Sequence, residues 1–230
     1  MKKIKINPTA LLAACALGVA ISASAQAQPA AGGAPPTATG QNYGLIGATY
    51  SEVDLGYLRQ DDAPKVSHDY DFIYNQAFLR TAGGGLDGNL TYDFLTGSAL
   101  GLHDYRNELQ AGVTAYLSPS WGKPFVTADA GQAWERVAGM DSKSLVYTFT
   151  GGVEFQVAPA VVLTPFVEYQ AEPWLDNHAP ALGNLPTHDW DYGVKATYRF
   201  TPQWGASLGV AMDQYNRNDL GYRAGLSYHF

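Results

Sequence analysis

The sequence is poor in cysteine and in charge, and beyond its first residues it has no long apolar run. Its only cysteine is Cys15, so no intramolecular disulfide can form. Charged residues make up 15% of the 230 residues, and the 21 acidic residues outnumber the 14 basic ones, which argues against a nucleic-acid partner. No segment beyond residue 27 approaches the run of about eighteen apolar residues that a transmembrane helix needs. A membrane location would therefore require a β-barrel, because only helices and closed barrels satisfy every backbone hydrogen bond in lipid.

Residues 1–27 predict a secretory signal peptide. Three of the first five residues are lysine, residues 10–21 form an apolar run too short to cross a bilayer, and small residues at 23–27 offer a cleavage site. The alternative is lipidation of Cys15, since residues 12–15 resemble a lipoprotein cleavage box. We favour ordinary cleavage after Sec-type export, which removes Cys15.

Residues 28–42 predict a disordered linker. This stretch consists mainly of proline, alanine and glycine and shows no periodicity, so it cannot bury enough apolar surface to order itself. Residues 43–230 then remain as one domain.

Within that domain apolar and polar residues alternate from about Thr49 to the end. A period of 2 is the signature of β-strands, and here one face of each stretch is apolar while the other is polar or glycine. The expected strands cover residues 52–57, 70–80, 90–94, 108–117, 126–131, 145–156, 167–171, 190–200, 206–213 and 220–230. The pattern predicts an all-β fold, a closed antiparallel transmembrane β-barrel of ten strands, an even number as single-chain bacterial barrels have.

The second of these stretches has no clear apolar face. Phe72, Tyr74 and Phe78 share a side with Gln76 and Arg80. We leave its faces unassigned, and a barrel of eight strands with a longer first segment is the alternative.

The last strand carries a family resemblance. Its apolar face holds Tyr222, Ala224, Leu226, Tyr228 and Phe230, and the aromatic Phe230 ends the sequence. In this it resembles the terminal strand of small bacterial outer-membrane β-barrels of the porin-like or surface-barrel type. The resemblance implies location in the cell outer membrane. It also implies that Tyr228 and Phe230 form the signal read by the outer-membrane insertion machinery, and that the partners of the barrel are outer-membrane lipid and lipopolysaccharide.

The connections between the expected strands are of two kinds. Tight turns rich in Gly, Pro and Ser are expected at residues 83–88, 118–122, 158–160 and 201–203. Longer loops are expected at residues 60–69, 99–105, 135–143, 173–188 and 214–219. Short turns on one rim and long loops on the other are typical of outer-membrane barrels, where the short turns face the periplasm.

The polar faces predict a charged barrel interior. Acidic residues outnumber basic ones on these faces, which hold Glu52, Asp54, Asp93, Glu108, Asp129, Glu154, Glu168, Asp191, Asp213, Lys195, Arg199 and Arg223. An unpaired buried charge is strongly unfavourable, so we expect an ionic network inside the barrel. Its predicted members are Glu108, Glu154, Glu168, Lys195, Arg199, Asp213 and Arg223. Cross-strand arithmetic pairs Glu168 with Lys195 and Asp213 with Arg223.

Three short segments pair histidine with aspartate and an aromatic residue. They are residues 68–70, 103–105 and 188–190, and each stands where an expected loop re-enters a strand. Histidine and carboxylate can bind a metal or act in acid–base catalysis. The simpler interpretation places the aromatic residue in the membrane-interface belt and the polar pair among lipid headgroups. We favour it, because three segments on non-neighbouring strands need not converge on one site, and no local motif matches the omptin proteases.

Three functions are compatible with these patterns. The first is an integral outer-membrane protein with a structural or surface-interaction role and no catalysis. The second is a narrow cation-preferring pore for small solutes, and the third is an outer-membrane hydrolase that uses His188 and Asp191. Under the first we expect no catalytic residue, no cofactor and no metal ligand.

Overall fold

A computed structural model describes residues 44–59, 66–99, 102–137, 140–172, 188–213 and 220–230. The predicted signal peptide at residues 1–27, the linker at 28–42 and the fate of Cys15 lie outside these residues and stay predictions. All strands belong to one compact unit, residues 42–229. None of the described residues forms a helix long and apolar enough to cross a membrane.

The described residues form ten strands. They are β1 (Tyr50–Arg59), β2 (Val66–Thr81), β3 (Gly84–Ala99), β4 (Leu102–Leu117), β5 (Lys123–Val137), β6 (Met140–Ala158), β7 (Val161–Ala171), β8 (His188–Arg199), β9 (Trp204–Asp213) and β10 (Leu220–His229).

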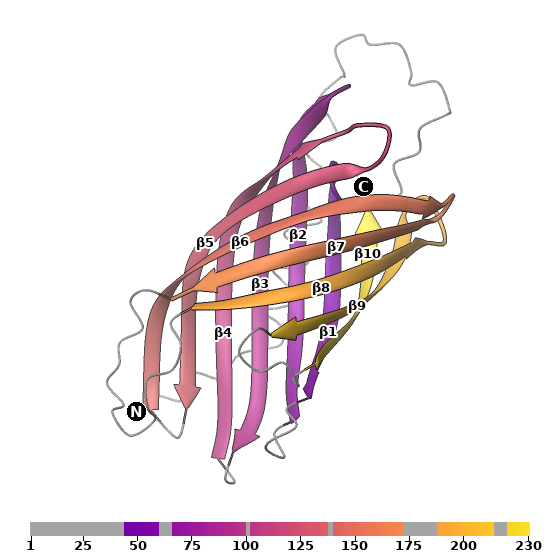
Figure 1. Cartoon of the computed structure of the whole chain (residues 1–230). Coiled ribbons are helices and arrows are strands. Elements are labelled where there is room, and N and C mark those ends of the chain that lie inside the picture. Colours follow the sequence, from indigo (N-terminus) through magenta and orange to yellow (C-terminus); the bar gives the residue numbers. More distant parts are fainter. Residues whose placement is uncertain (1–43, 60–65, 100–101, 138–139, 173–187, 214–219) are drawn as a thin grey trace. The chain divides into compact units, whose positions relative to one another are not determined.

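The strands form a closed barrel in which each pairs with its neighbours in sequence (Figure 1). The ladder closes between β1 and β10, which run antiparallel from Tyr50 opposite His229 to Arg59 opposite Leu220. Closure leaves no strand edge along this ladder, as a bilayer requires. The predicted ten-stranded antiparallel barrel is confirmed, and the eight-stranded alternative is wrong.

The apolar side chains point out of the barrel. On β4 the outward Leu109, Val113 and Leu117 are exposed, while the intervening Gln110 and Thr114 are buried. The same alternation runs through the other strands, with exposed apolar residues outside and polar residues inside. A water-soluble domain has the opposite arrangement, so this barrel matches a lipid environment outside and a polar one inside.

A β-bulge explains the unclear face of the second strand. The register between β2 and β3 shifts between Ala77 and Leu79, and the consecutive Phe78 and Leu79 are both exposed. Before the bulge, Asp69 and Asp71 are buried inside the barrel. One extra residue therefore reverses the parity in the last few residues of the strand.

Tight turns join the strands at one end of the barrel, which we call the turn end. Two residues separate β2 from β3 and β6 from β7 there, and the longer turns 118–122 and 200–203 serve the other two pairs. At the opposite loop end, the expected loops 99–105 and 135–143 are wrong. Strands β3 and β4 continue until only residues 100–101 separate them, and β5 and β6 until only 138–139 do. Strands β2–β6 have 15 to 19 residues, whereas β1 and β7–β10 have 10 to 12.

Aromatic side chains form two outward girdles. The turn-end girdle contains Phe78, Trp121, Phe155, Tyr198, Phe200, Trp204 and Tyr228, and the girdle toward the loop end contains Tyr70, Phe94, Tyr169, Trp190, Tyr192 and Tyr222. Neighbours within a girdle contact each other: Trp204 meets Tyr228 edge to face with ring centroids 5.0 Å apart, and Tyr169 lies tilted against Trp190 at 4.8 Å.

The distance between the girdles matches a bilayer. Trp190 and Phe200 stand ten positions apart along the chain of β8. At about 3.3 Å per residue and a tilt of about 40°, these positions differ in height by about 25 Å, the apolar band of an outer-membrane barrel.

A charged side chain introduced in the middle of this apolar band tests whether the outward face meets lipid. Leu208 is 68% exposed and lies midway between Trp204 and Met212 on β9. We expect Leu208→Arg to lower the free energy of unfolding by about 2–4 kcal/mol, measured by urea unfolding in phospholipid vesicles. Gln132→Arg, outward but nearer the loop end, is the control and should cost at most about 1 kcal/mol. Equal stability of both variants and the wild type would mean that this face does not meet lipid.

Candidate functional site

The interior of the barrel carries a row of carboxylates. Asp54 lies directly opposite Asp71, Asp71 opposite Asp93, and Asp93 opposite Glu108, so four neighbouring strands, β1–β4, each present an acid at one level. Asp69 stands two residues further along β2, on the same inner face. Like charges directly opposite each other on neighbouring strands are destabilising. The row therefore depends on positive charges brought from elsewhere.

Lys195 on β8 supplies one of these charges. Its Nζ lies 2.7 Å from Glu52 Oε2 and 3.4 Å from Asp54 Oδ2 on β1. The Ser207 hydroxyl on β9 donates a second hydrogen bond to Glu52, at 2.7 Å. Glu52 is only 1% exposed, so this ion pair spans the strands between β8 and β1 inside the barrel.

Arg223 on β10 supplies another positive charge to the carboxylate row. Its guanidinium lies 2.9 Å from Asp69 Oδ2 and 2.7 Å from Asp71 Oδ2. Gly56 on β1 stands between Arg223 and Asp69 in the ladder, and a Cβ there would lie 2.7 Å from the Asp69 Cβ. The missing side chain leaves room for arginine to reach across β1 to β2. About half of the Arg223 side chain is accessible, so water reaches this part of the lumen.

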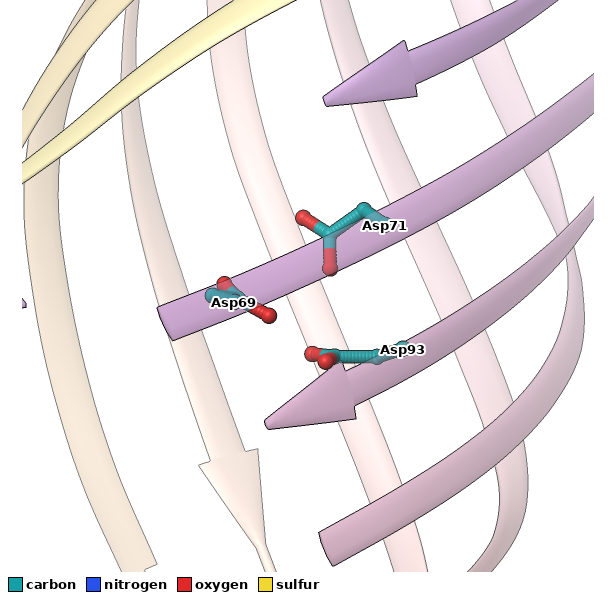
Figure 2. A group of neighbouring side chains, drawn as sticks. All are labelled: Asp69, Asp71 and Asp93. Atoms are coloured by element: carbon teal, nitrogen blue, oxygen red, sulfur yellow. The ribbon is translucent and has the colours of Figure 1, made fainter. Parts of the chain in front are cut away.

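The Asp69, Asp71 and Asp93 side chains converge beside this arginine. Figure 2 shows them turned toward one another from β2 and β3, and each offers a carboxylate oxygen within 4.8 Å of those of the other two. Their Oδ1 atoms are buried and have no hydrogen-bond partner. We call these three residues the aspartate triad.

Arg106 on β4 holds the far end of the carboxylate row. It forms ion pairs with Glu108 on its own strand and with Glu172, which follows β7. Gln170 donates to Glu108 at 3.1 Å, and Ser144 on β6 donates to Glu172 at 2.7 Å. This network ties β4, β6 and β7 together near the loop end.

Residues 44–49, which we call the luminal strap, lie inside the turn end just before β1. The Glu154 carboxylate accepts hydrogen bonds from the backbone N–H groups of Leu45 and Ile46 at 2.8 and 3.1 Å. Asp87 accepts one from Gly47 at 2.7 Å, and Lys123 donates to the Ile46 carbonyl oxygen at 2.9 Å.

The conformation of the strap depends on Gly47. Its φ of +78° lies in the left-handed region that favours glycine, and a Cβ there would lie 2.7 Å from the Tyr116 Oη. Asn75 adds a hydrogen bond to the Ala48 carbonyl oxygen at 2.6 Å. The strap is therefore held by side chains of β2 and β3, close to β1, and of β5 and β6, across the lumen from it.

The structure places the predicted network members in several groups. Lys195, Arg223 and Glu108 belong to the groups above, and Glu154 binds the strap. Glu168 accepts a hydrogen bond from Thr150 at 3.0 Å, and Arg199 contacts His229 at the turn end. The side chain of Asp213 lies outside the described residues.

The predicted pairing of Glu168 with Lys195 is wrong, and the predicted pairing of Asp213 with Arg223 involves a side chain outside the described residues and stays a prediction. Lys195 binds Glu52 and Asp54 instead of Glu168, since Glu168 lies opposite Asp191 in the register. Arg223 binds Asp69 and Asp71. The sequence pattern did not place these two aspartates on the inner face, because it did not reveal the bulge in β2. Pairing by position on neighbouring strands fails because lysine and arginine reach across one or two strands.

Sequence reasoning missed the strap, its ligand Asp87 and the aspartate triad. Asp87 precedes the expected third strand, and the strap shows no alternation. A glycine pair at 44 and 47 just before the first strand was the available signal.

The histidine–aspartate segments are placed on separate strands. His68 on β2 and His188 on β8 are exposed, whereas Asp69 points inward. The side chains of His103 and Asp104 lie outside the described residues. A further serine–histidine contact joins Ser227 to His229 at 3.4 Å, but Ser227 is 0% exposed and His229 also contacts Arg199.

The closed antiparallel barrel, its aromatic-bordered apolar exterior and its charged interior are those of an outer-membrane β-barrel. The chain is similar to the translocator domain of the autotransporter NalP from Neisseria meningitidis, at 10% identity over 97% of this chain and 98% of that one, with a TM-score of 0.46. It is also similar to an outer membrane channel from Pseudomonas putida F1, at 10% identity over 86% and 100% of the two chains, with a TM-score of 0.45. These likenesses concern the fold alone. No family model and no curated protein matches the sequence.

Removing Lys195 should strongly destabilise the barrel. Lys195→Met leaves the buried Glu52 and Asp54 without their base, and losing one partner of a buried ion pair costs about 3–5 kcal/mol. Denaturant unfolding in lipid vesicles measures the change. Lys143→Met, at an exposed site near the loop end, should stay within about 0.5 kcal/mol of the wild type. A small effect at Lys195 would show that water, not lysine, balances these acids.

Proposed function

We propose that this chain is an integral outer-membrane protein with a structural or surface role, whose lumen is closed to solutes. The observation that carries the proposal is the luminal strap. Its backbone is hydrogen-bonded to Glu154 on β6 and Lys123 on β5, which lie across the barrel from β1, and to Asp87 and Asn75 on the nearer strands β3 and β2. A ten-stranded barrel encloses little more space than side chains fill, so a backbone segment across it blocks passage.

The ion pairs deeper in the lumen support the same proposal. Lys195 with Glu52, Arg223 with Asp71 and Arg106 with Glu172 each join strands that are not neighbours in the barrel. They brace the wall against collapse while they occupy the interior. In this proposal the barrel needs rigidity and no transport path.

The long strands support a role at the outer surface. With 16 residues, β3 and β4 measure about 53 Å, or about 40 Å in height at a tilt of about 40°, which exceeds the apolar band of about 25 Å. The loop ends of the neighbouring β4–β6 carry polar contacts, such as Arg136 bonded to Asp141 at 2.6 Å and lying over the Tyr105 ring. In the proposed orientation this wall projects outside the cell, and the turn end faces the periplasm.

The proposed partners follow from this orientation. The two aromatic girdles would meet the headgroups of lipid and lipopolysaccharide. Tyr228, in the turn-end girdle, and Phe230 would serve as the signal for the insertion machinery. The proposal contains no catalytic step.

Planar-bilayer recording tests the closed lumen. We expect the purified wild-type barrel to give no discrete current steps. Gly47→Val should give steps, because the added side chain meets Tyr116 and the residue rarely adopts φ of +78°, so the strap leaves its site. Gly151→Val is the matched control and should stay silent, since a Cβ there meets nothing within 4 Å.

A narrow cation-preferring pore is the second candidate. The excess of luminal acids over bases favours it, because rings of carboxylates select cations. Discrete steps in the wild-type protein, with a reversal potential on the cation side in a salt gradient, would overturn the closed-lumen proposal in favour of this one.

A further inference from the structure

We propose that the aspartate triad binds a divalent cation of the Ca²⁺ type inside the barrel. The proposal concerns Asp69, Asp71 and Asp93 and is independent of whether the lumen conducts.

The first argument is the supply of positive charge along the carboxylate row. Asp54 lies beside Lys195, Asp71 beside Arg223 and Glu108 beside Arg106. Among the described residues, Asp93 is the member of the row that forms no ion pair with a basic side chain, since Arg223 contacts Asp69 and Asp71 instead, and it lies directly opposite two other acids. With Arg223 shared between Asp69 and Asp71, the triad keeps a surplus of two negative charges.

The second argument concerns the buried carboxylate oxygen atoms of the triad that have no hydrogen-bond partner. Arg223 uses the Oδ2 atoms of Asp69 and Asp71. The Oδ1 atoms of both residues are buried without a hydrogen-bond partner, as is Oδ1 of Asp93. Asp71 is 4% exposed and Asp69 is 9% exposed, so bulk water does not satisfy these atoms. A buried carboxylate oxygen without a partner is strongly unfavourable, and a cation held between the three carboxylates would give such oxygens a partner.

The geometry and the atom types indicate the class of cation. Ca²⁺ lies 2.3–2.6 Å from its oxygen ligands, so two of its ligands are at most about 5 Å apart. The triad oxygens lie within 4.8 Å of one another, and Figure 2 shows the three carboxylates facing a common space. An all-oxygen set of three carboxylates favours a hard cation over zinc or copper. Water in the lumen beside the half-accessible Arg223 would complete the coordination and give the ion a path.

Terbium luminescence tests the proposal, because Tb³⁺ occupies Ca²⁺ sites and is excited through nearby tyrosines. Tyr70 and Tyr92 lie on the same two strands as the triad. The folded full chain in a phosphate-free, non-ionic detergent should give a signal that saturates at one Tb³⁺ per barrel. Ca²⁺ should displace it, and NaCl of equal ionic strength should not.

Two variants make the assignment specific. Asp93→Asn should weaken Tb³⁺ binding by about tenfold or more, because it removes one of three charged ligands without touching the arginine contacts. Asp129→Asn changes another luminal acid, which is hydrogen-bonded to Asn89 at 2.5 Å, and should bind like the wild type.

The opposite results would overturn the proposal. They are no saturating signal in the wild type, displacement by NaCl alone, or equal loss in both variants. If Asp93→Asn does not fold, the wild-type protein still decides, since Ca²⁺ should raise its melting temperature relative to a chelator and an unchanged melting temperature would refute the site.

Discussion

Closure of the hydrogen-bond ladder between β1 and β10 is the constraint on which the rest of this structure depends. In lipid an open strand edge would leave a row of backbone groups without partners, so the ten strands are stable only as a closed cylinder. Closure also fixes two environments. Every second side chain faces hydrocarbon, and the others face an interior that is too narrow to hydrate each charge separately.

The interior meets this constraint by dividing charge around the wall. The carboxylate row lies on β1–β4, and the bases that pair with it come from β4, β8 and β10. Long side chains make this possible, because lysine and arginine cross one or two strands where glycines such as Gly56 leave space. The ion pairs therefore act as braces between distant strands. The aspartate triad is the place where three acids share one base.

The two ends of the barrel serve different purposes in the proposed function. At the turn end, the strap uses backbone groups to bind Glu154 and Asp87, so one short segment supplies hydrogen-bond donors to both of these acids. At the loop end, β2–β6 extend beyond the length that a bilayer needs, and their outward residues become polar. A closed inner end and a projecting outer end suit a protein that acts at the surface.

Much of this could be read from the sequence, because strand faces have a period of two. Leu109, Val113 and Leu117 point outward as their parity predicts, and Glu52, Glu108 and Glu154 point inward. The tight turns also follow from local chemistry. Where local rules change, the prediction failed: the bulge after Ala77 hid the faces of Asp69 and Asp71, and polar residues near 99–105 and 135–143 were taken for loops although strands continue through them above the membrane.

What the sequence by itself determined is the class of fold. A segment with alternating apolar and polar residues and no long apolar run can cross a membrane only as part of a closed β-barrel. Which charges meet was decided only by the tertiary structure. Lys195 and Glu52 are 143 residues apart, and their contact depends on closure, register and the length of a side chain that spans strands. None of these quantities is encoded locally, so neither the strap nor the triad could be found before the barrel was closed.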